Sequence, residues 1–521
     1  MNRNRNQHTP ADQHPPRTVD RTPGEPGRLR LAAEDWPGRA QPKPLGIASD
    51  GGMIGLSVEG ARHHVHVPGA TGTGKSTWLA NLALAEAATG RGLAVIDPQG
   101  DLAAGVLDRL PASAGARLVI LDPAERDAPP AWNVFAPPGI DDLEGREFAA
   151  EMVIGTFRKV YAQWWGPRMD EVFRAACLTL ARRPGSTLAD VVAILTRPGF
   201  GRAITARYGE PGGFEGFWDD YDTLTPAQRQ QSYGPVISRL RAVLSHRFAR
   251  DLLTAPATTI DLTQILDGGI LIARLPKGEI GDHGCQLVGS LLLSGLWSAA
   301  THRATVPPVR RRDATIIVDE CHNFLHLPIG VDTVLAEARG YRVSLVLAHQ
   351  HLRQLPPDIA GAVDANARNK IVFTVSPDDA RKLAPHFAPF FDATDLANRP
   401  GFAVSARIVH NGHAAPPFSL DTVALPPAVP GRAEALRSAA RASTGLPLAR
   451  RQTLQRRGDL ATADTETDPT DTDPDADSGA GQWGSRSVSH PVSPSVSHLR
   501  TGHPPGHPLP PLPQVGEGGD R

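Results

Sequence analysis

The stretch GATGTGKST, residues 69–77, carries glycines, a lysine and hydroxyl residues at the spacing of a phosphate-binding loop. In the pattern G-x-x-x-x-G-K-[ST], glycines let backbone N–H groups curl around phosphate oxygens at the positive end of the helix that follows. We expect Lys75 to reach the β- and γ-phosphate oxygens and the Ser76 hydroxyl to bind Mg²⁺. The predicted nucleotide-binding residues are Gly69, Ala70, Thr71, Gly72, Thr73, Gly74, Lys75, Ser76 and Thr77.

Two neighbouring carboxylates end the apolar run ATIIVDE. We expect Asp319 to hold Mg²⁺ through water and Glu320 to polarise the water that attacks the γ-phosphate. An ordinary acidic transition from strand to loop is the alternative interpretation. Cys321 and His322, which follow directly, are interpreted as incidental.

ATP with Mg²⁺ is the expected ligand. The guanine-recognition pattern N-K-x-D is absent, because Ile371 and Val372 follow the lysine of RNKIVF. Adenylate kinases and related kinases have a phosphate-binding loop but no such pair of carboxylates. The residues therefore favour ATP hydrolysis over a GTP switch or the phosphorylation of a small molecule, with Lys75 and Glu320 as catalytic groups.

Gln350 closes the next apolar run, VSLVLAHQ. An α/β protein keeps its ligand at the carboxyl edge of the sheet, so the amide should lie beside the two carboxylates and sense the γ-phosphate. The alternative is a strand cap that bonds to the backbone. Arg339 comes shortly before the same run, and its type and position fit a core-facing residue and a surface charge equally well.

The elements that must position these residues form an α/β pattern. Between residues 63 and 122, apolar runs alternate with amphipathic helices, which predicts a parallel sheet with crossover helices. The strands then give way to helical patterns and resume with GGILIARLP. We therefore predict a central, mostly parallel sheet interrupted by an all-α insert domain. The predicted order is a disordered tail (1–45), the first half of the core (46–140), the helical insert (141–258), the second half of the core (259–424) and a disordered Pro/Asp/Ser-rich tail (425–521).

Composition excludes some classes of protein and leaves others open. The 54 Lys and Arg residues balance 55 Asp and Glu residues, so net charge neither supports nor excludes a nucleic-acid partner. Cys177, Cys285 and Cys321 lie far apart, which argues against a disulfide framework or a thiolate zinc site and fits a reducing cytosol. No run of about 18 apolar residues predicts a membrane span.

The motifs together are more specific than any one of them. The order GATGTGKST, VIDPQGDL, WNVF, a helical insert, IIVDECHNFL and LAEARGYRVSLVLAHQ resembles the HerA/FtsK superfamily of ring ATPases. It is most similar to the type IV secretion coupling proteins, the TraD/TraG-like group of conjugative DNA transfer ATPases, of the actinobacterial type. The resemblance covers residues 45 to 415, approximately, and implies a RecA-like P-loop NTPase core.

This resemblance implies a homo-hexameric ring with ATP between subunits and DNA in the central channel. An arginine of an E-x-R-x-x-G-like segment completes the neighbour's site in that family, and this catalytic role would fall on Arg339. The alternative is that Arg339 pairs with Glu337 or caps its helix. Arg239 and Arg241 are rival candidates for the same role.

Other positions match the family without an assigned chemistry. They are expected to support the site: Asp97, Asp101, Asn133 and Asn366. Membrane-bound coupling proteins carry N-terminal transmembrane helices, which this sequence does not show. Docking to a secretion channel would therefore need a separate partner, such as a channel component or a relaxase; the alternative is that no docking occurs. We expect a cytoplasmic protein, recruited peripherally to the inner face of the cell membrane if it serves such a channel.

The expected function is an ATP-hydrolysing hexameric DNA translocase that pumps DNA in conjugative transfer. One alternative is a HerA-like ATPase in DNA processing or phage defence. Others are a protein-directed assembly or secretion ATPase and a nucleotide-gated recruitment platform. The sequence leaves open whether the DNA is single- or double-stranded.

Three weaker features have ordinary explanations beside functional ones. His63, His64 and His66 fit a strand edge better than a metal site. Trp164 and Trp165 fit packing anchors better than stacking platforms for single-stranded DNA. The run RRR, residues 310–312, fits a solvated turn better than a DNA contact.

Overall fold

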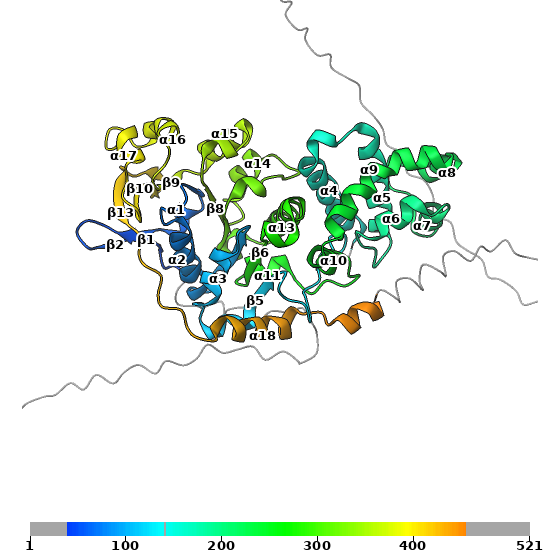
Figure 1. Cartoon of the computed structure of the whole chain (residues 1–521), viewed down its shortest axis with the longest axis horizontal. Helices are drawn as coiled ribbons and strands as arrows, with labels where there is room; N and C mark the ends of the chain where they lie inside the picture. Colours follow the sequence, from blue (N-terminus) through cyan, green and yellow to red (C-terminus); the bar gives the residue numbers. More distant parts are fainter. Residues whose placement is uncertain (1–38, 140–141, 455–521) are drawn as a thin grey trace, which may run out of the picture. The chain divides into compact units, whose positions relative to one another are not determined.

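A single large sheet organises the chain (Figure 1). This computed structural model describes residues 39–139 and 142–454. In this part of the chain the sheet has eleven strands in the order β2-β1-β13-β10-β9-β3-β8-β7-β4-β6-β5. The strands are β1 (Lys43–Ile47), β2 (Met53–Leu56), β3 (Val65–Pro68), β4 (Gly92–Asp97), β5 (Leu118–Leu121), β6 (Ile270–Arg274), β7 (Ala314–Val318), β8 (Val343–His349), β9 (Asn369–Val372), β10 (Ala403–Arg407) and β13 (Phe418–Asp421).

The sheet is parallel in its centre and antiparallel at one side. From β9 through β3, β8, β7, β4 and β6 to β5, all neighbouring strands pair in parallel. The remaining strands, β10, β13, β1 and β2, pair antiparallel. A separate short ribbon joins β11 (Val409–His410) to β12 (His413–Ala414). The predicted mostly parallel α/β sheet is confirmed.

Alternating residues of the central strands explain the two layers of helices. In β4, Ala94 and Ile96 belong to the hydrophobic cluster that contains α13 (Asp282–His302). Leu93 and Val95 belong instead to the cluster with α2 (Lys75–Ala88) and α3 (Asp101–Leu107) on the other face. Successive side chains of a strand point to opposite faces, so a strand buried on both faces reads as a continuous apolar run.

Helices alone fill the described chain between β5 and β6, as the sequence predicts. They are α4 (Leu143–Val160), α5 (Pro167–Arg182), α6 (Asp190–Thr196), α7 (Phe200–Tyr208), α8 (Phe217–Thr223), α9 (Pro226–Leu244), α10 (Arg247–Leu253) and α11 (Leu262–Leu266). Their buried side chains share one cluster with α13, so the insert packs onto the sheet through that helix. The other helices are α1 (Val58–Ala61), α12 (Lys277–Ile280), α14 (Val331–Glu337), α15 (Pro357–Asn366), α16 (Pro377–Leu383), α17 (Ala393–Ala397) and α18 (Arg432–Thr444).

Helix α18 corrects the prediction of disorder from residue 425 onward. It runs along β5 and α3 (Figure 1) and buries Leu436 and Ala440, which are four residues apart and so lie on one helix face. Its Arg437 forms an ion pair with Asp122. Because the segment is rich in Ala and Arg, its composition alone does not indicate this narrow apolar face.

The N-terminal boundary also differs from the prediction. Strand β1 begins at Lys43, inside the stretch 1–45 that composition predicts to be disordered. The rest of both predicted tails, 1–38 and 455–521, lies outside the described residues. In the described chain, no helix is long and apolar enough to cross a membrane.

Candidate nucleotide site

The loop GATGTGKST joins β3 to α2 and is held from both sides. Gly69 donates its N–H to the His349 carbonyl at 3.2 Å, and Ala70 donates to the Thr374 carbonyl at 2.8 Å. Gly74, at φ 108°, adopts a left-handed conformation at the start of α2 that favours glycine. A Cβ on Gly69 would lie 2.5 Å from Phe373 Cβ, so the neighbouring strand leaves no room for a side chain.

Lys75 points back into this loop. Its ammonium donates to the Gly69 carbonyl at 2.5 Å and to the Ala70 carbonyl at 3.1 Å. Burial lowers the pKa of Lys75, and the carboxylates of Glu320 and Asp319 oppose this shift. No carboxylate of the described residues lies within ion-pair distance of its Nζ, so the buried cation is available to an anion.

The two carboxylates follow β7 and are both buried. Burial, together with the nearby carboxylates of Asp97 and Glu320, raises the pKa of Asp319 to about 7. Crowded, desolvated carboxylates resist ionisation unless a cation compensates them. The donor set therefore fits a hard divalent cation such as Mg²⁺, with the exposed Ser76 hydroxyl at the start of α2 as a second oxygen ligand.

Glu320 is held in an unusual backbone conformation. Its φ of 45° and ψ of 51° lie in the left-handed region, which a glutamate rarely adopts. Such conformations cost about 1–3 kcal/mol and gather at functional sites. One oxygen, Oε2, is buried without a hydrogen-bond partner among the described residues. His322, interpreted from the sequence as incidental, places its Nδ1 3.6 Å from that oxygen.

Gln350 bridges the loop and the carboxylates. Its Nε2 donates to Glu320 Oε1 at 2.6 Å, and its Oε1 accepts the Thr71 hydroxyl at 3.0 Å. The side chain therefore connects the phosphate-binding loop to the residue expected to polarise water. This is not the geometry of a side chain that only caps its own strand.

Asp97 shapes the turn of the DPQGD motif beside these carboxylates. Its two oxygens accept the N–H groups of Gln99 at 2.8 Å and Ala103 at 2.9 Å, which fixes the start of α3. Asp101 is exposed in the first turn of that helix. Asp97 thus supports the loop and also raises the pKa of Asp319.

The two asparagines singled out from the sequence lie elsewhere. Asn133 is buried and donates to the carbonyls of Ser186 and Pro256, which ties together distant parts of the helical insert. Asn366 ends α15 and donates to the Ala362 carbonyl of its own helix. Neither has a contact with the phosphate-binding loop among the hydrogen bonds of the described residues.

Arg339 lies at the opposite edge of the sheet from the phosphate-binding loop. It is exposed in the turn before β8, whereas Gln350 follows the carboxyl end of that strand. Seven residues of strand separate the two positions by about 23 Å. Arg339 therefore does not reach the Lys75 site of its own chain. No ion pair of the described residues joins it to Glu337.

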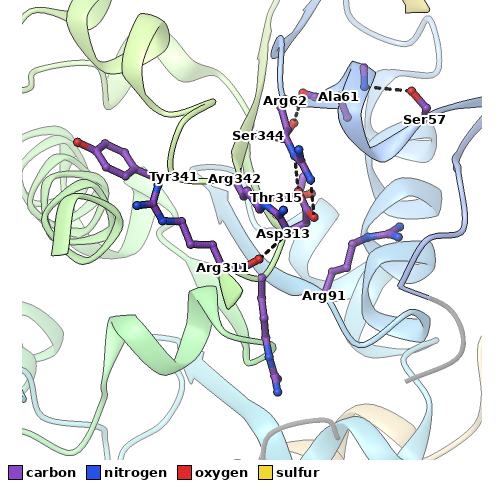
Figure 2. A network of polar contacts seen from close by, with 12 residues as sticks. Ser57, Ala61, Arg62, Arg91, Arg311, Asp313, Thr315, Tyr341, Arg342 and Ser344 are labelled. Carbon is purple, nitrogen blue, oxygen red and sulfur yellow. Dashed lines mark hydrogen bonds and ion pairs between the residues drawn. The ribbon is translucent and has the colours of Figure 1, made fainter. Parts of the chain in front are cut away.

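Figure 2 shows the polar network at this edge. Arg62 forms a two-point ion pair with Asp313, and Arg342 donates to the Arg311 carbonyl at 2.9 Å. Arg342 occupies the last position of the E-x-R-x-x-G-like segment, and its φ of 57° is a conformation that favours glycine. The side chains of Arg311 and Arg342 bond to backbone carbonyls, so they brace the loops at this edge.

The rival arginines are on α9. The guanidinium of Arg239 lies 5.8 Å from the Tyr161 ring and 5.9 Å from the Trp164 ring, and Arg241 is exposed. Trp164 is itself half exposed, while Trp165 packs edge-on against the insert's core. These residues belong to the helical insert.

The histidines before the loop make hydrogen bonds in the core. His64 donates from Nε2 to the Leu335 carbonyl at 2.7 Å, and its Nδ1 accepts the Leu345 N–H at 3.0 Å. His66 and His349 share a hydrogen bond of 2.7 Å between their Nε2 atoms and stack with ring centroids 5.0 Å apart. Among the described residues, no group of three or more His, Cys, Asp or Glu side chains is placed to hold a metal ion, so these histidines form no such site.

Phe402 is a neighbour of the loop that the sequence did not indicate. Its N–H donates to the Thr73 carbonyl at 2.9 Å, although it lies far away in the chain. Its turn, RPGF, carries no chemical signature, so only the pairing of β10 with β9 and β13 brings it here.

The comparisons with known proteins agree with this geometry. Residues 49–199 match the family model of the type IV secretion-system coupling protein DNA-binding domain. The chain is also similar to solved structures of the plasmid coupling protein TrwB, each at 16% sequence identity. The chain has the fold of the type IV secretion coupling proteins. No curated protein matches it.

Three TrwB complexes illustrate the extent of the similarity. The complex with a non-hydrolysable ATP analogue has a TM-score of 0.52 and covers 79% of this chain and 97% of TrwB. The complex with ADP and Mg²⁺ has a TM-score of 0.51, with coverage of 78% and 97%. The complex with a non-hydrolysable GTP analogue has a TM-score of 0.51, with coverage of 74% and 90%. The family model thus covers residues 49–199, and the solved structures extend the similarity of fold to most of the chain.

Proposed function

We propose that the chain is an ATP-hydrolysing DNA translocase that acts as a homo-hexameric ring in conjugative, type IV secretion-like transfer. One observation carries the hydrolytic part: Gln350 joins Thr71 of the phosphate-binding loop to Glu320. A residue that contacts both groups can couple the state of the γ-phosphate to the carboxylate that activates water. The segment match to the coupling-protein DNA-binding domain supports DNA as the substrate.

The residues have separate tasks in this proposal. Lys75 leaves the loop carbonyls and neutralises the β- and γ-phosphate oxygens, while the loop N–H groups bind the same oxygens. Glu320, with one unpartnered buried oxygen, orients the attacking water and accepts its proton. Asp319 and Ser76 would hold Mg²⁺, which supplies charge stabilisation to the transferred phosphoryl group. TrwB, crystallised with ADP and Mg²⁺, supports this choice of ligands.

Arg339 is proposed to act in trans, on the site of the adjacent subunit. A guanidinium brought to the γ-phosphoryl group by a neighbour neutralises transition-state charge and makes hydrolysis depend on ring assembly. Its exposure, and the length of strand between it and its own site, support this arrangement. Arg339→Ala rings should assemble and bind ATP but hydrolyse poorly. Mixing them with Lys75→Ala subunits should restore some turnover, and a failure at every ratio would argue against the trans role.

The proposed cellular setting rests on the similarity to coupling proteins. A coupling ATPase delivers DNA to a secretion channel, so a channel component or a relaxase is the expected partner. We propose a cytoplasmic protein that such a partner recruits to the inner face of the membrane.

The first test is steady-state ATP hydrolysis by the purified protein with no DNA, with single-stranded DNA and with duplex DNA. Each series is run across protein and salt concentrations, with Lys75→Ala as the blank. Turnover that rises steeply with protein concentration and again with DNA is expected, and the more stimulating form of DNA identifies the substrate. Phosphate contacts weaken with salt, so DNA stimulation should fall as salt rises.

Turnover that does not change with DNA, even at low salt, would refute the proposal of a DNA translocase. A protein-directed ATPase would then be the better explanation. Turnover equal to that of Lys75→Ala under all conditions would refute ATP hydrolysis itself.

A further inference from the structure

Phe402 is an exposed aromatic residue with a left-handed backbone. The residue is 53% exposed, and its φ is 65°. For a bulky residue this conformation is a genuine outlier. Packing in a core does not explain it, because the ring is not buried. Strain of this kind is retained where a ligand or a function uses the residue.

The strained residue is tied to the nucleotide site by its backbone. The N–H of Phe402 donates to the Thr73 carbonyl at 2.9 Å, and its carbonyl accepts the Thr422 N–H at 2.7 Å. A Cβ built on Gly74 would lie 2.8 Å from Phe402 Cδ1 and 3.3 Å from Cε1. The ring therefore lies directly against the residue that caps α2.

The location of the ring matches the path of a bound nucleotide. In a loop of this type the backbone N–H groups and the first turn of the helix hold the phosphates. The nucleoside is joined to those phosphates, so it must leave the loop beside the start of α2. An exposed aromatic face at Gly74 lies next to that exit.

We propose that Phe402 is the platform on which the base of the bound nucleotide stacks. This inference rests on the proposed nucleotide-binding function and adds the residue that recognises the base. Stacking on an aromatic face tolerates any base, because every base has a π-face. The platform should therefore raise affinity for nucleoside triphosphates in general rather than select one purine.

The residue whose backbone is bonded to Phe402 has a polar side-chain atom with no partner among the described residues. The Oγ1 atom of Thr422 is buried and forms no hydrogen bond with any described residue, although the backbone of Thr422 is bonded to Phe402. Buried hydroxyl groups normally have a partner. A base edge or a ribose hydroxyl is the kind of group that would satisfy it, and inorganic phosphates lack the base.

The test separates the contribution of the base to binding affinity from that of the phosphates. Binding of ATP, of ADP and of inorganic tripolyphosphate, each with Mg²⁺, is measured by isothermal titration calorimetry on the full chain. Phe402→Ala should weaken ATP and ADP by about 5- to 150-fold, the range of a lost aromatic–base stack, and leave tripolyphosphate unchanged. Phe402→Tyr, which keeps the ring, should restore most of the nucleotide affinity.

Phe390→Ala is the matched control. Phe390 is 56% exposed, almost the same fraction as Phe402, but it lies just before α17 and has no contact with the loop among the interactions of the described residues. It should leave all three affinities unchanged. Melting temperatures of all variants show whether a loss of affinity reflects unfolding.

Several outcomes would contradict the proposal that the base stacks on Phe402. Equal losses for ATP and tripolyphosphate would mean that Phe402 only shapes the loop. Unchanged nucleotide affinity in Phe402→Ala, with altered ring assembly in sedimentation, would assign the ring to a subunit interface. Both outcomes leave the proposed function standing provided that Lys75→Ala weakens all three ligands. If Lys75→Ala weakens none of them, the nucleotide site itself is wrong.

Discussion

Acid should destabilise the folded chain through its buried histidines, and His64 offers the clearest case. His64 is 1% exposed, and burial lowers its pKa to about 4 from an ordinary value of 6.5. Its neutral form is fully bonded, because Nε2 donates to the Leu335 carbonyl and Nδ1 accepts from Leu345. A proton on Nδ1 would face the Leu345 N–H, so two donors would oppose each other.

The direction and the size of this effect of pH on folding stability follow from proton linkage. In the unfolded chain His64 is protonated below about pH 6.5, whereas in the folded chain it is protonated only below about pH 4. Stability is therefore complete above pH 6.5 and is lost as the pH falls from 6.5 towards 4. For these two pKa values the loss at pH 5 is about 2 kcal/mol. His349, with its pKa lowered by burial to about 4, contributes a similar amount.

The assay compares the unmutated chain with His64→Asn at pH 7.5 and pH 5. Asparagine tolerates the left-handed φ of 57° at this position and does not titrate. The variant should be less stable at pH 7.5, by about 1–3 kcal/mol, because the buried Leu335 carbonyl and Leu345 N–H lose their histidine partner, yet it should lose less stability on acidification. The hydrogen-exchange rate of the Leu345 amide, corrected for intrinsic rates, measures the loss of stability around His64.

The control replaces an exposed histidine, His410→Asn, and should leave the pH dependence unchanged. The reasoning would be refuted if His64→Asn lost as much stability between pH 7.5 and pH 5 as the unmutated chain does. It would also fail if the Leu345 amide kept its protection in the unmutated chain at pH 5.

Three further changes test other parts of the structure. Glu86→Ala should lower the free energy of unfolding at pH 7 by about 3–5 kcal/mol, read from urea titrations, because it leaves two buried cations unpaired; an effect below 1 kcal/mol would contradict this. Arg342→Gly should match or exceed the melting temperature of the unmutated chain because its φ of 57° favours glycine, whereas Arg342→Val should melt lower; equal melting temperatures for the two variants would count against strain. Glu320→Gln should lower kcat by about 100-fold or more while ATP affinity is kept, so a parallel loss of affinity would mean a structural role.

Local patterns predicted that the candidate nucleotide-site residues would meet at one edge of the sheet. The phosphate-binding loop, Asp319, Glu320 and Gln350 each end or follow a strongly apolar run, and parallel strands bring their carboxyl ends to one edge. The position of Gln350 beside Glu320 thus follows from strand order alone. The sequence could not indicate the left-handed backbone of Glu320, which depends on the turn that follows β7.

The features that the sequence did not reveal depend on contacts between distant segments. Lys43 and Glu86 look like surface charges, yet they form a 2.8 Å ion pair in the core, where neighbouring cations lower the Glu86 pKa to about 2 despite its burial. Phe402 has no periodic pattern to mark it, and only sheet pairing places it against Gly74. Propensity and periodicity report local preference, so they do not identify such long-range partners.

Strand β8 connects the two halves of the proposed chemistry. Its carboxyl end leads to Gln350 at the nucleotide site, and Arg339 precedes its amino end at the opposite edge. All seven residues of the strand are buried. Val346–His349 pair in parallel with β3 on one side, and Val343–Leu347 pair in parallel with β7 on the other. A shift at its amino end would therefore disturb the ladder with β7, and a shift at its carboxyl end would disturb the ladder with β3.

In a ring, this rigidity would make the two ends move together. A displacement of Gln350 when the γ-phosphate is lost would then reach Arg339, which we propose acts on the next subunit. We expect Gln350→Ala to lower both the turnover and the cooperativity between neighbouring ATP sites. The Hill coefficient for ATP should fall towards one in this variant, measured with saturating DNA. A slower enzyme with an unchanged Hill coefficient would confine Gln350 to its own site and remove β8 as the link.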